Sequence, residues 1–195
     1  MSLQPLKFVV SGPVGSGKTT FIQTLSETEV VSTDESASEN IGKAETTVAL
    51  DFGTVHIDDA LLFLFGTPGQ ERFDFMWDVL CEGALGLLVL VSASKPSDFR
   101  HSRHILEFIS SRYALPYVVG VTHEDELGAW AAEDVGMYFD VSDDLIIGCD
   151  PREPRSCAHA LSTLLSVIHD ETDPPAPAVP HLTSVPPHGI SPRSE

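Results

Sequence analysis

Short apolar runs alternate along this chain with longer segments in which apolar residues recur at helical spacing. Three of the runs are rich in Val and Leu and do not alternate strictly with polar residues, which is typical of strands buried on both faces of a sheet. They cover 7–11, 84–92 and 117–121. Further strands are expected over 46–55 and 60–65, joined as an antiparallel hairpin by a turn at 57–59, and over 145–149.

Helical spacing of apolar residues predicts five helices. They cover 18–27, 72–81, 97–111, 129–138 and 154–168. The segment 28–45 has no apolar period and is expected to be a loop. Because strands alternate with helices, the pattern predicts a three-layer α/β domain with a mostly parallel six-stranded sheet and one antiparallel edge strand.

The composition changes near residue 169. Seven of the 14 prolines lie between Pro174 and Pro192, among Ser, Thr, His and Ala. Such a segment buries too little apolar surface to offset its ordering entropy, so we divide the chain into a folded domain over 1–169 and a disordered tail over 170–195. The PxxP spacings within the tail fit a polyproline-binding groove, but a solvated tail is the favoured interpretation.

The charge balance excludes two classes of partner. The chain of 195 residues contains 29 Asp and Glu against 11 Lys and Arg, a formal net charge of −18 at pH 7. Nucleic acids and anionic membrane surfaces need clustered basic residues, which this chain lacks. The longest apolar run, 83–91, is much shorter than the roughly 18 to 20 residues that span a bilayer. The ends show neither a secretion signal nor a prenylation motif, so we expect a cytoplasmic protein without a direct membrane anchor.

Cysteine and histidine residues do not suggest a disulfide framework or a zinc site. Cys81, Cys149 and Cys157 are odd in number and lack the spacing of zinc ligands. His101 and His104 share a helix face, but no third ligand is evident and a solvated helix face is favoured.

The motif that carries chemistry is Gly12-Pro13-Val14-Gly15-Ser16-Gly17-Lys18-Thr19, placed between the first expected strand and the first helix. It matches the phosphate-binding loop G-x-x-x-x-G-K-[ST], in which backbone N–H groups and the lysine contact phosphates and the hydroxyl binds Mg²⁺. The residues expected to hold phosphates are Gly12, Val14, Gly15, Ser16, Gly17, Lys18, Thr19 and Thr20, with Thr19 also a magnesium ligand.

Two further motifs follow strands in a fixed order. Thr67-Pro68-Gly69-Gln70-Glu71 follows the third expected strand, and Thr122-His123-Glu124-Asp125 follows the fifth. With the phosphate loop and a Thr-rich entry to the second strand, this set resembles the Ras-like small GTPases, and within them the bacterial MglA-type and conservon-type proteins. The resemblance covers about residues 7–168 and implies the P-loop NTPase (small G-protein) fold.

The resemblance also implies a base-binding site formed by Thr122, His123, Asp125, Cys149, Asp150 and Pro151. The Asp125 carboxylate can accept two hydrogen bonds from guanine, whose exocyclic amine adenine lacks. A site built for such hydrogen bonds rejects an analogue that cannot make them, so GTP and GDP are the expected ligands. His123 stands where the family usually has a lysine that lies along the base.

Four positions bear on magnesium and on the transition state. By register Thr47 matches the family threonine that senses the γ-phosphate through Mg²⁺, and Thr46 takes the place of an arginine that acts in cis in some relatives. Gly66 stands where most small GTPases have an aspartate that holds a magnesium-bound water. Asp51 is the nearest carboxylate by sequence, but it lies roughly 13 Å from Thr47 along an extended strand. We therefore do not expect Asp51 to replace that aspartate, and weaker metal binding is predicted.

Gln70 matches the family residue that orients the attacking water, beside Gly69, whose N–H would contact the γ-phosphate; Lys18 completes the expected catalytic set. Because no arginine precedes Thr47, a partner protein is expected to accelerate hydrolysis, and the resemblance suggests a roadblock-type protein. Arg72 is an internal alternative. The bulky residues that follow form either a docking patch or part of the core; they are Phe73, Phe75, Met76 and Trp77.

These observations predict a guanine-nucleotide switch with slow intrinsic GTP hydrolysis, GTP and GDP as ligands and Mg²⁺ as cofactor. A GTP-binding scaffold that does not hydrolyse is the main alternative, motivated by Thr46, Gly66 and His123. A small-molecule kinase is the least favoured, because such enzymes use arginines over two phosphorylated substrates. Arginine is absent here before residue 72 and between residues 112 and 152.

Overall fold

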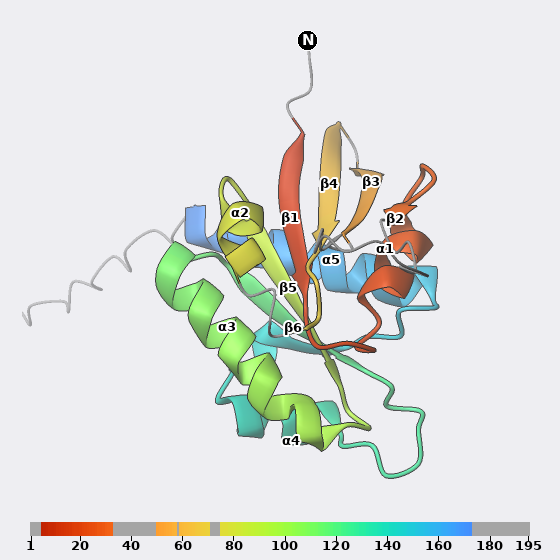
Figure 1. Cartoon of the computed structure of the whole chain (residues 1–195), viewed down its shortest axis with the longest axis vertical. Helices are drawn as coiled ribbons and strands as arrows, with labels where there is room; N and C mark the ends of the chain where they lie inside the picture. The colour runs from red at the N-terminus through yellow and green to blue at the C-terminus, as the bar shows by residue number, and fades with distance from the viewer. Residues whose placement is uncertain (1–4, 33–49, 58, 71–74, 173–195) are drawn as a thin grey trace, which may run out of the picture.

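A seven-stranded sheet with helices on both faces forms the frame of the protein (Figure 1). The computed structural model describes residues 5–32, 50–57, 59–70 and 75–172. The strands are β1 (Leu6–Ser11), β2 (Val31–Ser32), β3 (Asp51–Ile57), β4 (Ala60–Gly66), β5 (Gly86–Ser92), β6 (Tyr117–Thr122) and β7 (Ile146–Gly148). The helices are α1 (Lys18–Leu25), α2 (Phe75–Cys81), α3 (Phe99–Tyr113), α4 (Ala132–Phe139) and α5 (Pro154–Thr172), with short 3₁₀ turns at Pro96–Asp98 and Asp143–Leu145.

The strand order is β2-β3-β4-β1-β5-β6-β7, and β3 runs antiparallel to both of its neighbours, whereas the other pairs are parallel. This confirms the predicted α/β fold with a mostly parallel sheet and an antiparallel hairpin. The strand β2 lies outside β3, within the segment expected to be a loop. Its two residues are too few to give a periodic signal in the sequence.

Alternate residues of the central strands face opposite cores. Along β5, Leu87, Val89 and Val91 belong to one core cluster, while Leu88 and Leu90 belong to the other. The first cluster is covered by α2, α3 and α4 and the second by α1 and α5 (Figure 1). Burial on both faces explains why the apolar run is continuous rather than alternating.

Several element ends differ from the predicted ones by a few residues. Helix α5 continues to Thr172 rather than ending at 168. The predicted start of α2 at 72 is not tested, because residues 71–74 lie outside the described part of the chain, in which α2 covers Phe75–Cys81. Thr46, Thr47, Arg72 and Phe73 lie outside the described residues, as do the residues of the predicted tail beyond 172. No helix in the described part of the chain combines the length and apolarity that crossing a bilayer requires.

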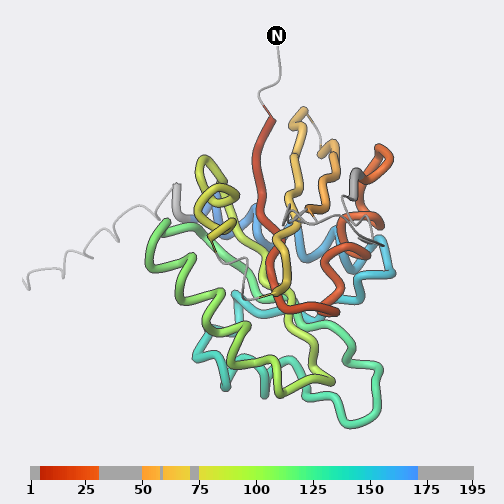
Figure 2. Tube along the Cα trace, viewed as in Figure 1, coloured from red at the N-terminus to blue at the C-terminus, as the bar shows by residue number. Residues whose placement is uncertain are grey.

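One edge of the sheet collects the loops that carry the sequence motifs. The parallel strands β4, β1, β5, β6 and β7 all end at this edge, and β3, which runs the other way, begins there with Asp51 paired to Gly66. In Figure 2 the red loop after β1 and the gold segment after β4 lie side by side at this edge. The topology therefore brings together residues that are far apart in the sequence.

Candidate functional site

The phosphate loop has the backbone that its glycines permit. Gly12, Gly15 and Gly17 have positive φ angles of 144°, 77° and 98°, and α1 begins immediately after Gly17. A Cβ atom on Gly12 would lie 2.3 Å from the Leu90 carbonyl oxygen, so no other residue fits there without moving β5. Glycine adopts these angles freely, which is how the sequence specifies the loop.

Lys18 is buried at the start of α1. Its Nζ atom donates hydrogen bonds to the carbonyl oxygens of Gly12 (2.8 Å) and Pro13 (2.7 Å). Burial lowers the pKa of Lys18 from 10.5 to about 8, and the negative charge of Asp51 acts in the opposite direction. Lys18 is the one buried charged residue in the described part of the chain, and its ammonium group lies inside the loop.

The segment after β4 lies directly on the phosphate loop. A Cβ atom on Gly69 would be 2.6 Å from the Val14 nitrogen and 2.9 Å from Lys18 Nζ. The buried residue Thr67 anchors this segment, because its N–H donates to the Val10 carbonyl and its hydroxyl shares a hydrogen bond with Ser11. Gln70 follows Gly69 and is exposed at the surface.

The Asp51 side chain lies in tight contact with the position that a Cβ atom on Gly66 would take. Asp51 pairs with Gly66 across the β3–β4 hairpin, and a Cβ atom on Gly66 would lie 3.0 Å from Asp51 Cβ. The Thr19 hydroxyl donates a hydrogen bond of 2.6 Å to Asp51 Oδ2. Pairing between strands, and not spacing along one strand, therefore brings Asp51 to Thr19. The expected separation of Asp51 from Thr47 is not tested, because Thr47 lies outside the described residues.

A second cation near the phosphate loop was not predicted. The Nζ atom of Lys95 lies 3.0 Å from the position that a Cβ atom on Gly15 would take. Lys95 is exposed and lies three residues beyond the end of β5. The sequence contains a signal for this placement, because Lys95 closely follows a central strand and the loops after parallel strands meet at one edge of the sheet.

All of the expected base-binding residues except Thr122 line one pocket of about 260 Å³ at the same edge. Its lining consists of Gly17, Thr20, His123, Glu124, Asp125, Cys149, Asp150, Pro151 and Arg152. The buried Thr122 links this pocket to the phosphate loop, because its hydroxyl is 3.0 Å from the Ser16 carbonyl oxygen. The same hydroxyl is 2.8 Å from Nδ1 of His123, whose φ angle is positive at 59°.

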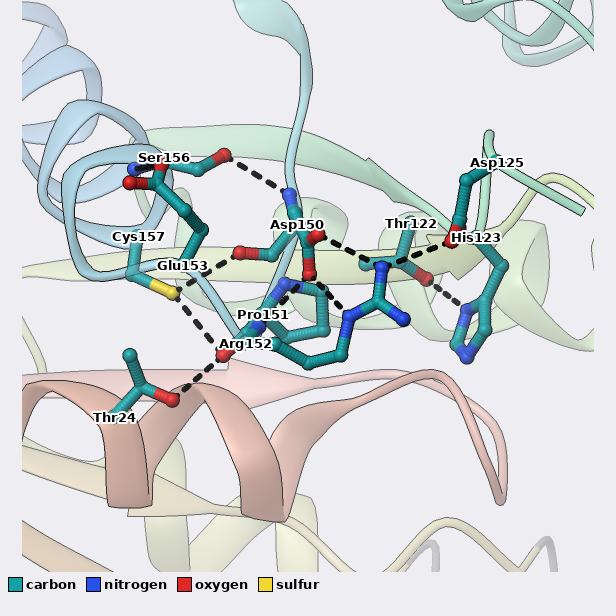
Figure 3. A network of polar contacts seen from close by, with 10 residues as sticks. All are labelled: Thr24, Thr122, His123, Asp125, Asp150, Pro151, Arg152, Glu153, Ser156 and Cys157. Carbon is teal, nitrogen blue, oxygen red and sulfur yellow. Dashed lines mark hydrogen bonds and ion pairs between the residues drawn. The ribbon is translucent and has the colours of Figure 1, made fainter.

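Arg152 bridges two carboxylates across this pocket (Figure 3). Its Nε and Nη2 atoms each donate to Asp150 at 2.8 Å, and Nη2 also donates to Asp125 Oδ2 at 2.9 Å. Hydrogen bonds from Arg152 lower the pKa of Asp125 and lower that of Asp150 to about 2. The contact of Arg152 with Asp125 was not predicted, because the sequence around Asp150 and Pro151 does not indicate the direction of the Arg152 side chain.

The loop between β7 and α5 is fixed from two sides. The Thr24 hydroxyl of α1 donates to the Pro151 carbonyl oxygen (2.7 Å), and the buried thiol of Cys157 in α5 lies 3.4 Å from the same oxygen (Figure 3). A Cβ atom on Gly17 would be 2.8 Å from Pro151 Cγ, so this loop also packs on the phosphate loop. These contacts therefore join the pocket that contains Pro151 to the phosphate loop motif and to α1.

Helix α2 contributes to the core through Trp77. This side chain is buried, and its ring packs against Phe108 and His104 of α3 with centroids 5.2 and 5.8 Å apart. Phe75 and Val79, in contrast, are each 63% exposed. Of the residues predicted as either patch or core, Trp77 thus belongs to the core and Phe75 to the surface. Among the described residues no group of three His, Cys, Asp or Glu side chains lies together as a metal site.

Comparisons with known proteins identify one family. The profile of the family described as "Conserved hypothetical ATP binding protein" matches residues 27–176, which is more than half of the chain. The uncharacterized protein MJ1339 of Methanocaldococcus jannaschii is 32% identical over 128 residues, which cover 64% of this chain and 74% of that protein.

A further relative and a solved structure also match the chain. ADP-ribosylation factor-related protein 1 of Rattus norvegicus is 28% identical over 134 residues. The match covers 67% of this chain and 65% of that protein. The structure of the Arl6 BBS3 small GTPase from Trypanosoma brucei with bound GppNp superimposes with a TM-score of 0.66 at 14% identity, over 85% of this chain and 98% of that one. This likeness shows that the chain has the small-GTPase fold.

Proposed function

The chain belongs to the family described as conserved hypothetical ATP-binding proteins, and we propose that it is a guanine-nucleotide switch with slow intrinsic GTP hydrolysis. One observation carries this proposal. The hydrogen bond from Thr122 to the Ser16 carbonyl joins the phosphate loop to a pocket lined by Asp125. A nucleotide placed on the loop would reach that pocket with its base.

The phosphates would be held by the residues predicted from the sequence. Backbone N–H groups of the loop and the N-terminus of α1 favour negative charge, and Lys18 supplies a full positive charge. The Thr19 hydroxyl and the Asp51 carboxylate are hard oxygen donors, the kind of ligand that Mg²⁺ takes together with nucleotide phosphates. Bound there, Mg²⁺ would neutralise charge on the β- and γ-phosphates. Thr47 remains a proposed ligand that lies outside the described residues.

Guanine would be read by Asp125. A carboxylate has about four lone-pair sites on two oxygens, and Arg152 uses one of them. The remaining sites suffice for the N1–H and 2-amino groups of guanine. Adenine presents no donors at the corresponding positions and would leave the carboxylate unpaired, which strongly disfavours its binding.

Hydrolysis would proceed by attack of water on the γ-phosphorus. Gln70 would orient the water, and the bond from the γ-phosphorus to the β–γ bridging oxygen would break, giving GDP, inorganic phosphate and a proton released to solvent. The Gly69 N–H and Lys18 would stabilise charge on the transferred group. No arginine precedes Thr47, so a partner that contributes positive charge, of the roadblock type by resemblance to MglA-type and conservon-type proteins, would accelerate the step.

The switch itself would lie in the segment that holds Gly69. This glycine touches the phosphate loop without room for a side chain, so a γ-phosphate and the Gly69 segment must adjust to each other. The exposed residues Phe75 and Val79 on the following helix are placed to report that adjustment to a partner. Loss of the γ-phosphate would release the contact.

ATP is the second candidate ligand, because the family description names ATP and the matched residues include His123, Asp125 and Arg152 of the pocket. The Arg152 guanidinium is a donor at the pocket and could serve the N1 acceptor of adenine. Single-turnover hydrolysis of GTP beside ATP with Mg²⁺, in wild type and Gln70→Ala, tests both candidates. GTP turnover that falls in the variant supports the switch, whereas binding without turnover in either protein supports a non-hydrolysing scaffold or an obligatory partner. Equal or faster ATP turnover contradicts the guanine assignment.

A further inference from the structure

Position 66 at the end of β4 is a glycine and has no carboxylate, but the residue paired with it on β3 is Asp51. We propose that Asp51 provides the carboxylate of the magnesium site, in place of an aspartate at position 66; this inference rests on the proposed function. Asp51 is the first residue of β3 and Gly66 the last residue of β4, and they are paired directly across the antiparallel hairpin. Side chains at directly opposed positions project to the same side of a sheet with Cβ atoms about 5 Å apart.

A side chain at position 66 would crowd Asp51. A Cβ atom on Gly66 would be 3.0 Å from Asp51 Cβ and 3.4 Å from Asp51 Oδ2. It would also lie 3.0 Å from Ile22 Cδ1 of α1, so it could not move away from Asp51 freely. An aspartate at 66 would therefore require Asp51 or Ile22 to shift. Glycine at 66 leaves Asp51 in place without that adjustment.

The hydrogen bond between Thr19 and Asp51 prepares the threonine for a metal. A hydroxyl has one proton and two lone pairs. In this structure the Thr19 hydroxyl donates its proton to Asp51 Oδ2 at 2.6 Å, so the lone pairs of the hydroxyl oxygen are available to a metal ion. A carboxylate that accepts the proton of a ligating group fixes that group's orientation and increases its basicity.

The charge of Asp51 also suits this place. The negative charge of Asp51 raises the pKa of Lys18, so the carboxylate and the ammonium group are close enough to interact. Magnesium sites in nucleotide-binding proteins are typically built from one or two carboxylates together with substrate phosphates and several waters. Apart from Asp51, no carboxylate among the described residues has a hydrogen bond to the phosphate loop or to Thr19. Within the described part of the chain, Asp51 on β3 is therefore the one candidate carboxylate ligand for magnesium at this place.

The test uses the dependence of nucleotide release on Mg²⁺. Full-length wild type, Asp51→Asn and the double variant Asp51→Gly/Gly66→Asp are loaded with fluorescent GDP, and its release is followed over a range of free Mg²⁺ concentrations. Asparagine keeps an oxygen that can accept from Thr19 but lacks the charge. Asp59→Asn, at the exposed far end of the same hairpin, is the matched control. Far-ultraviolet circular dichroism and thermal unfolding confirm that each variant is folded.

We expect Asp51→Asn to raise the Mg²⁺ concentration needed for slow release at least tenfold and Asp59→Asn to leave it unchanged. The double variant, which moves the carboxylate to the opposite strand, should return within threefold of wild type. A folded Asp51→Asn protein with the Mg²⁺ dependence of wild type would overturn the proposal and leave Asp51 as a hydrogen-bond partner only. A folded double variant that stays at the Asn level would overturn the equivalence of positions 51 and 66. Failure of wild type to bind GDP or GTP at any Mg²⁺ concentration would instead refute the proposed function.

Discussion

Arg152 Nη2 donates to Asp125 Oδ2 across 2.9 Å and so joins the loop after β7 to the loop after β6. The same guanidinium is held by both oxygens of Asp150, which fixes its plane (Figure 3). Bidentate pairing of this kind sets geometry as well as charge. Arg152 is thus placed to orient the carboxylate that we propose reads guanine.

Arg152→Ala should weaken the discrimination between GTP and ITP. Inosine keeps N1–H but lacks the 2-amino group, so the GTP to ITP affinity ratio reports how well Asp125 is aligned with that group. We expect this ratio to fall about tenfold, the size of one charged hydrogen bond. Competition against fluorescent GDP measures it.

The ion pair between Arg152 and Asp125 should contribute little to the free energy of unfolding. The side chains of Arg152 and Asp125 are 62% and 60% exposed, and such pairs contribute at most about 1 kcal/mol to the free energy of unfolding. Arg155→Ala, an exposed arginine on α5, is the control and should leave both the ratio and the stability unchanged. An unchanged ratio in Arg152→Ala would show that Arg152 does not position Asp125.

Nucleotide affinity should fall as the pH rises above about 8. In the nucleotide-free protein the pKa of Lys18 is lowered to about 8 by burial, while phosphates favour its protonated form and raise that pKa on binding. Binding above pH 8 therefore takes up a proton, and affinity should decrease by up to about tenfold per pH unit. Titrations with GDP between pH 7 and pH 9 measure this. Lys18→Arg stays charged over that range, so a fall of equal slope in that variant would contradict the assignment.

Lys95→Gln should slow GTP hydrolysis. Its ammonium lies beside Gly15 of the phosphate loop, where positive charge favours the negative charge that builds up in phosphoryl transfer. We expect the single-turnover rate to fall by about tenfold at low salt and by less at high salt, because the exposed charge is screened. Arg100→Gln, an exposed change on α3, should have no effect. Equal rates for Lys95→Gln and wild type at low salt would exclude this contribution.

Two residues of α2, the buried Trp77 and the exposed Phe75, should differ in their contribution to the free energy of unfolding. Trp77→Ala removes a fully buried ring that packs on α3 and should lower the free energy of unfolding by about 3 to 5 kcal/mol. Phe75→Ser, at an exposed position, should change it by less than about 0.5 kcal/mol. Urea denaturation measures both. A large loss in Phe75→Ser would show that this side chain belongs to the core and not to a docking surface.

The fold was predictable because its signals are local. The apolar run that became β5 faces two cores, and the glycines of the phosphate loop adopt the positive φ angles that their motif requires. Thr122 ends the recognisable strand β6 and Asp125 follows it, and both lie at the predicted edge of the sheet. In each case a few consecutive residues contain the physical reason for the structure.

The remaining features depend on contacts between distant segments. The approach of Asp51 to Thr19 follows from the register of β3 against β4, which no single strand encodes. The Arg152 bridge depends on the direction of one side chain between two loops, and the burial of Trp77 on the docking of a seven-residue helix against α3. Long-range pairing of this kind is decided by tertiary packing and not by local propensity.

The central claim is that Asp125 selects guanine, and equilibrium competition among GDP, ADP and xanthosine diphosphate on wild type and Asp125→Asn tests it most directly. Asparagine presents an amide donor in place of a carboxylate oxygen, and xanthine carries a carbonyl acceptor where guanine carries its amine. The account predicts that wild type binds GDP at least about 100-fold more tightly than ADP and that the variant shifts its preference toward the xanthine nucleotide. Equal or tighter binding of ADP by wild type would contradict it.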